Sequence, residues 1–163
     1  MAYTPLAVAN TFLRKHGDEG GIEHMKLQKL CFYAYGWWLT QSDEPLLSEG
    51  PEVWKYGPVF SSLYTILAPH GRKPITTPQK TIFNSVAKIV PPEDKRARDL
   101  VDWIWQRYGG SSSFKLSDET HKEGTPWQTE AAKYDYRVPT NHRIPDSVIK
   151  KYFVREAKKL SAA

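Results

Sequence analysis

The chain has 163 residues, a formal net charge of +5 and a single cysteine, Cys31. This length suits one domain over residues 1–163 with a substantial core, and one cysteine excludes an intrachain disulfide. No apolar run approaches the ~20 residues of a membrane span, and the first residues lack the basic and apolar regions of a signal peptide. We therefore expect a cytoplasmic protein with no membrane contact.

The first predicted helix begins at Thr4-Pro5. Threonine can cap the first turn, and proline suits a position that needs no amide donor. An apolar stripe continues to about His16, and Gly17 is placed to end the helix.

The second predicted helix, at about residues 23–41, contains the segment MKLQKLCFYAYGWWL. Its apolar residues cover nearly the whole circumference, which is typical of a helix buried on more than one side. We expect the other helices to pack on it, and we expect Cys31 to be a small buried apolar residue. Its exposed edge is expected at Lys26, Gln28 and Lys29.

Extended chain is expected after this helix. Leu46–Ser48 and Val53–Lys55 flank a Glu-Gly-Pro turn, which suits two extended arms or a small β-hairpin near residues 46–55. Pro58 can open a short helix. Residues 72–90 are irregular, and their isoleucines and phenylalanine, Ile75, Ile82 and Phe83, are expected to pin this loop to the core.

Four further helices complete the prediction. Pro91–Asp94 is typical of a helix start, because acidic residues in the first turn interact favourably with the helix dipole. That helix is expected to reach Tyr108. Ser111–Ser113 can cap a short helix that runs to about His121, and the others are expected after Thr125-Pro126 and after Ile144–Asp146. The sequence thus predicts a mainly α-helical, compact domain around a central apolar helix.

No catalytic motif is visible in the chain. It contains no phosphate-binding loop, no dinucleotide-binding glycine pattern and no nucleophile elbow. The five histidines have no metal-like spacing to one another or to Cys31. We therefore expect no catalytic residue, metal or cofactor, and a protein that is not an enzyme.

The most suggestive polar cluster is Glu119–Glu123. Two carboxylates beside His121 could tune an acid or a base. A structural role is the favoured interpretation, because Thr120 and His121 lie where a short helix ends and can bond free backbone groups before Pro126. A binding role for His121 is the alternative.

Charge and aromatic content keep a nucleic-acid role open. The densest basic group lies at 150–159, although a solvated helix face explains it equally simply. Aromatic residues among basic ones could stack single-stranded nucleic acid, but no recognition helix or single-strand motif is visible. A nucleic-acid-binding regulator that represses its own operon is therefore an alternative, and nucleic acid is not the partner we expect.

Four blocks of the chain resemble the Panacea domain, the family of SocA-like and GepA-like phage-associated proteins. The blocks are MKLQKLCFYAYGW, PEVWKYGPVFSSLY, LSDETHKEGTPW and IPDSVIKKYF. Each block alone is weakly specific, but the four occur in the family's order over about residues 22–153. The matching framework residues are Lys26, Leu27, Lys29, Leu30, Tyr33, Trp54, Gly57, Pro58, Val59, Tyr64, Thr120, His121, Pro126 and Trp127.

This resemblance implies a mainly helical antitoxin of a toxin–antitoxin pair, which neutralises a toxin protein by direct binding. One family member is implied to deliver its toxin to the ClpXP protease, so a proteolytic adaptor role is open. Because toxins vary widely within the family, toxin choice is expected to lie in the first helix, the loop at 72–90 and the last helix. The residues expected to contact the partner are Arg72, Lys73, His121, Lys150 and Arg155.

Overall fold

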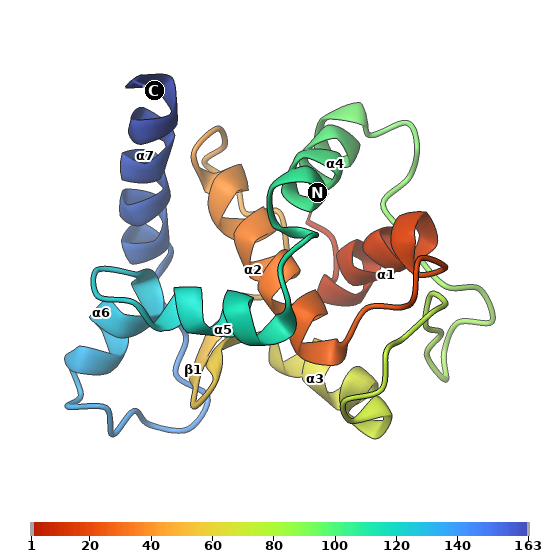
Figure 1. Ribbon diagram of the computed structural model, residues 1–163, viewed down its shortest axis with the longest axis horizontal. Helices are drawn as coiled ribbons and strands as arrows, with labels where there is room; N and C mark the ends of the chain where they lie inside the picture. Colours follow the sequence, from red (N-terminus) through yellow and green to blue (C-terminus); the bar gives the residue numbers. More distant parts are fainter. Residues whose placement is uncertain (1, 163) are drawn as a thin grey trace.

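The computed structural model describes residues 2–162, so the first and last residues of the predicted 1–163 domain lie outside it (Figure 1). The described chain is mainly α-helical with a two-stranded hairpin, as the sequence predicts. The elements in order are α1 (Pro5–His16), α2 (His24–Leu39), β1 (Glu52–Trp54), β2 (Gly57–Val59), α3 (Ser61–Leu67), the 3₁₀ turn η1 (Ala68–His70), α4 (Lys95–Tyr108), α5 (Ser113–His121), α6 (Pro126–Ala132) and α7 (Asp146–Ala162).

Helix α2 lies at the centre of the fold. Helices α1, α3, α4, α5 and α7 and strand β2 all pack against it, and Figure 1 shows it between α7 on one side and α1 and α4 on the other. The apolar circumference explains this position, because each face of α2 meets a different element. The predicted central helix is confirmed, and its side chains without exposed surface include Leu27, Leu30, Cys31 and Ala34.

Local capping signals place most helix starts. The Thr4 hydroxyl accepts a hydrogen bond from the Ala7 amide at 3.1 Å, and the Thr125 hydroxyl accepts one from Gln128 at 3.3 Å. Helix α4 begins at Lys95 and not at the predicted prolines. The reason is that the Asp94 carboxylate caps it, accepting from the Ala97 amide at 3.1 Å, so the prolines lie in the preceding turn.

The hairpin is present but lies further along the chain than predicted. Strands β1 and β2 pair antiparallel, with Glu52 opposite Val59 and Trp54 opposite Gly57. The prediction that 46–48 forms one arm is wrong, because Leu46 is buried and its backbone bonds Tyr3 near the start of the chain. Gly57 makes the tight turn possible, since its φ of +111° disfavours a residue with a side chain.

Helix α7 approaches α2 closely near its middle. A Cβ atom on Gly36 would lie 2.0 Å from the Phe153 ring, so the glycine makes room for this buried phenylalanine. Beyond Phe153 the helix buries no further residue, and Figure 1 shows its last turns extending past the end of α2. No helix within residues 2–162 is long and apolar enough to cross a membrane.

The long loop before α4 is anchored to the core at Ile75, as predicted, but not at Ile82 and Phe83. Ile75 is 2% exposed, and its backbone exchanges two hydrogen bonds with Ile22, at 2.8 and 2.9 Å. Ile82 and Phe83 are 93% and 86% exposed. The expectation that these two residues pin the loop to the core is therefore wrong, because the chain turns outward before it reaches them.

Candidate functional site

The sequence motifs meet at one place, which we call the hairpin junction: Lys29, Trp54, Gly57, Pro58, Ser117, Thr120, His121 and Trp127. Lys29 projects from the middle of α2 and has no exposed surface. Its ammonium donates a hydrogen bond to the Pro58 carbonyl at 3.1 Å. Burial disfavours the charged form and lowers the pKa of Lys29 from 10.5 to about 7. The junction therefore has a titratable group at its centre.

Gln28 bonds the backbone of Phe60, two residues after the Pro58 carbonyl that Lys29 bonds. Its carboxamide accepts from the Phe60 amide at 2.9 Å and donates to the Phe60 carbonyl at 3.3 Å. The Gln28 amide nitrogen also lies 3.1 Å from Nε2 of His24. Burial lowers the pKa of His24 to about 4, and the charges of Lys29 and His70 contribute smaller effects in the same direction. A neutral His24 ring can thus accept the second N–H of the Gln28 amide.

These positions correct the expected exposed edge of the central helix. Gln28 and Lys29 are fully buried. Lys26 is half-buried, with its ammonium on the Gly109 carbonyl and 5.2 Å from the centre of the Trp105 ring. Polar groups on α2 can be buried because the hairpin and the start of α3 offer backbone partners that no local pattern reveals.

Three consecutive carbonyl oxygens of the hairpin turn are held by side chains of α5 and α6. The Trp127 indole donates to the Trp54 carbonyl at 2.7 Å, and the Ser117 hydroxyl donates to the Tyr56 carbonyl at 2.7 Å. Between them, Nε2 of His121 lies 3.0 Å from the Lys55 carbonyl. These three hydrogen bonds fix the hairpin turn to α5 and α6.

His121 also bonds its own helix, because its Nδ1 lies 2.6 Å from the Ser117 carbonyl. Thr120 does the same through its hydroxyl, which donates to Ser117 at 2.6 Å. This agrees with the structural interpretation of the cluster at the end of the helix. The contact between His121 and Lys55 was not predictable, because these residues are 66 positions apart.

The junction is closely packed around Gly57. A Cβ atom there would lie 2.7 Å from the Thr120 hydroxyl oxygen and 3.1 Å from the Lys29 ammonium nitrogen. Residues from α2, the hairpin and α5 thus converge on one glycine. Lys29 lies behind this layer, so a substrate has no route to its amine through the described structure.

A surface pocket of about 340 Å³ lies beside the junction. Trp54 and Trp127 form part of its walls, and Tyr136, which is 57% exposed, stands at its edge. The remaining lining residues are mostly apolar, so the pocket suits an apolar side chain of a partner. They are Val53, Lys55, Ala131 and Val138.

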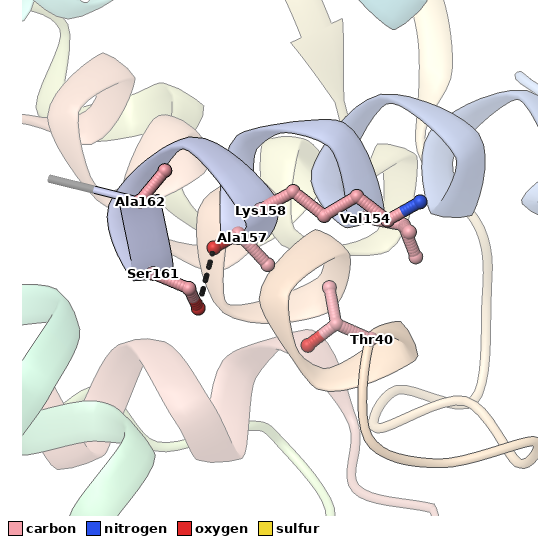
Figure 2. Close-up of a pocket in the computed structure, with 6 residues that line it drawn as sticks. All are labelled: Thr40, Val154, Ala157, Lys158, Ser161 and Ala162. Atoms are coloured by element: carbon pink, nitrogen blue, oxygen red, sulfur yellow. Dashed lines mark hydrogen bonds between the residues drawn. The ribbon is translucent and has the colours of Figure 1, made fainter.

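A second hollow, of about 470 Å³, lies between the end of α2 and the last turns of α7. Figure 2 shows Thr40, which follows α2 directly, below Val154 and Ala157. The Ser161 hydroxyl donates to the Ala157 carbonyl at 3.2 Å. Lys158 and Ala162 complete the lining. The hollow arises because α7 continues after the chain of α2 has turned away.

A buried ion-pair cluster closes the loop after α6. The Glu130 carboxylate is buried and accepts from Nε2 of His142 at 2.6 Å and from the Lys133 ammonium at 2.9 Å. Burial raises the pKa of Glu130, but these hydrogen bonds and charges outweigh it and leave the pKa below its usual value. Sequence reasoning missed this cluster, and no three His, Cys, Asp or Glu side chains within 2–162 are grouped as a metal site requires.

The residues expected to contact a partner lie on different parts of the surface. Arg72 and Lys73 are exposed in the loop after η1. Lys150 pairs with Asp43 at 3.2 Å, and Arg155 donates to the Gly124 carbonyl at 3.3 Å, both from α7. Figure 1 places α7 and the loop on opposite sides of the molecule. The structure does not bring these cations together.

The fold and the junction define a mainly helical domain in which side chains of α2, α5 and α6 bond the backbone of the hairpin. The chain belongs to the antitoxin SocA-like, Panacea-domain family, because that family's model matches residues 27–128, from Leu27 in α2 to the first turn of α6. It is also 32% identical to Antitoxin SocA of Caulobacter vibrioides (strain NA1000 / CB15N) over 151 residues, which cover 90% of this chain and 80% of that protein. No solved structure matches this chain. The resemblance read from the four blocks is confirmed.

Proposed function

We propose that this chain is an antitoxin that neutralises a cognate toxin protein by binding it directly. The observation that carries the proposal is the similarity to Antitoxin SocA along 90% of the chain. The geometry supports it, because the junction residues bond one another and leave no route to the Lys29 amine. Binding requires no catalytic group, so the proposed role is not enzymatic.

The direct test is genetic and uses the open reading frame next to this gene as the source of the toxin. That frame is expressed alone and then together with this chain, and growth is measured. We expect growth arrest in the first case and growth in the second, with the two proteins co-purifying. A neighbour that is harmless alone, or that still arrests growth beside this chain, would show that the proposal is wrong.

A second measurement separates sequestration from delivery to a protease. The half-life of the toxin is followed by pulse-chase, with and without this chain, in cells that have or lack ClpX. A toxin that becomes short-lived only when both this chain and ClpX are present indicates an adaptor. An unchanged half-life with full protection indicates sequestration in a stable complex.

Nucleic-acid binding is the second candidate, and an uneven charge distribution favours it. Residues 53–92 contain no Asp or Glu and five cations, Lys55, Arg72, Lys73, Lys80 and Lys88. Phosphate contacts would make the affinity fall steeply with salt, by about 0.9 log units per contact for each log unit of salt. A mobility-shift assay at low salt, with DNA from upstream of this gene, tests the idea. The absence of any shift would remove this candidate.

A further inference from the structure

The loop before α4 contains a segment that is tied at both ends, residues 79–88, which we call the clamped loop. Asn10 of α1 is fully buried, and its amide nitrogen donates to the Gln79 carbonyl at 2.9 Å and to the Lys88 carbonyl at 3.0 Å. Its oxygen accepts from the Gln79 amide at 2.7 Å. One buried side chain therefore fixes the entry and the exit of the loop.

Two further contacts define the shape of the clamped loop. Just beyond it, the Thr11 hydroxyl accepts from the Val90 amide at 2.9 Å. At the tip, the Thr81 hydroxyl accepts from the Phe83 amide at 3.3 Å and from the Asn84 side chain at 3.2 Å. The tip is thus a closed turn on a fixed base, which lowers the entropy lost when it binds.

This ordered turn presents apolar side chains to water. Ile82 is 93% exposed, Phe83 is 86% exposed and Val86 is 72% exposed. Single exposed apolar residues are common, whereas three within five positions of one ordered loop form a local apolar surface, the kind of feature from which interaction sites are built. Figure 1 shows the loop on the outer side of the molecule beside α1, away from α7.

The charged residues along the chain from 72 to 90 are all basic. Lys80 and Lys88 are exposed within the clamped loop, and Arg72 and Lys73 are exposed in the preceding part of the chain. Among the ion pairs formed within residues 2–162, none involves these four cations. The surface that complements the loop is therefore apolar at its centre and acidic around it.

We propose that the clamped loop inserts Ile82, Phe83 and Val86 into an apolar pocket with an acidic rim on the cognate toxin. This inference rests on the proposed antitoxin function and names the surface that performs it. A protein pocket fits the tip better than nucleic acid does, because two of its three apolar side chains, Ile82 and Val86, are aliphatic and have no ring to stack on a base. It fits better than a bilayer, because membrane binding scales with the apolar area that is buried, and three side chains on one turn bury little area.

The test compares matched variants at two exposed sites. Phe83→Ser removes the proposed anchor, and Phe114→Ser removes a phenylalanine of similar exposure, 82%, on α5. Lys80→Glu and Lys115→Glu form the corresponding charge pair, since both lysines are exposed. Each variant is titrated with the purified product of the neighbouring open reading frame, and its thermal midpoint is recorded. All four sites are at the surface, so we expect unchanged folding.

We expect Phe83→Ser to weaken the Kd by at least about 30-fold, the size of an interface hot spot. Phe114→Ser and Lys115→Glu should stay within about 3-fold of the wild type. Lys80→Glu should weaken binding at low salt and less so at high salt. Growth protection should be lost in the same order.

The outcomes separate the two proposals. Binding and protection that are unchanged by Phe83→Ser overturn the role of the loop and leave the antitoxin function standing. A wild-type chain that neither binds nor protects removes both. Two control probes are vesicles of phosphatidylcholine with phosphatidylglycerol and a single-stranded DNA oligonucleotide. The wild type could bind one of these probes, and Phe83→Ser could abolish that binding while leaving toxin binding unchanged. This result would assign the loop to that probe and overturn the proposal.

Discussion

Replacing Lys29 by methionine tests whether a charge is buried in the hairpin junction. The folded protein holds the pKa of Lys29 at about 7, whereas its ordinary value is 10.5. A difference of about 3.5 pKa units corresponds to about 5 kcal/mol. At low pH, where Lys29 is protonated in both the folded and the unfolded protein, burying its charge lowers the free energy of unfolding by this amount. Methionine has a similar volume and no charge, so Lys29→Met removes this penalty.

The sign follows from the lowered pKa. Between pH 7 and 10.5 the unfolded chain binds a proton at Lys29 that the folded chain does not bind. The free energy of unfolding therefore rises with pH, by up to about 1.4 kcal/mol per pH unit from this group, and the gain is lost as the pH falls towards 7. Buried Cys31, whose pKa is raised from 9.0, acts in the opposite direction only at higher pH.

The assay is urea unfolding at pH 6, 7 and 8.5, followed by tryptophan fluorescence. We expect the wild type to gain about 2 kcal/mol between pH 7 and 8.5, whereas Lys29→Met should show little change. At pH 6 the variant should be at least as stable as the wild type, although it leaves the Pro58 carbonyl without its donor, at a cost of about 1–3 kcal/mol. Lys115→Met on exposed α5 is the control and should keep the wild-type slope. A wild type without a slope, or a Lys29→Met variant with the same slope, would refute the reasoning.

Two other changes probe the same junction. Gly57→Ala should destabilise by about 1–3 kcal/mol in thermal or urea unfolding, because φ is +111° and the new Cβ would meet the Thr120 hydroxyl at 2.7 Å; an unchanged midpoint contradicts the packing. For His24, the folded pKa of about 4 lies below the ordinary 6.5, so stability should fall by up to about 2 kcal/mol from pH 6.5 to 5. His24→Gln should remove most of that loss, and equal pH profiles would disprove the assignment.

Where the forces are local, the sequence alone determined much of this protein. The capping hydroxyls of Thr4 and Thr125, each followed by proline, place the starts of α1 and α6. The largely apolar circumference of residues 25–39 identifies the buried central helix, since a helix that is apolar nearly all round is normally buried on more than one side. The four ordered blocks also identify the family, because identity and order are properties of the chain itself.

Only the tertiary structure decided which polar groups are buried and which apolar groups are exposed. Lys29 and Gln28 look like a solvated helix edge. In the fold, however, Lys29 donates to the Pro58 carbonyl and Gln28 accepts from the Phe60 amide, both about 30 positions away. Asn10 gave a weak signal, because it lies on the apolar face of α1 between Leu6 and Leu13, but its partners are about 70 positions away. Burial depends on which distant segments meet, and no local pattern records that.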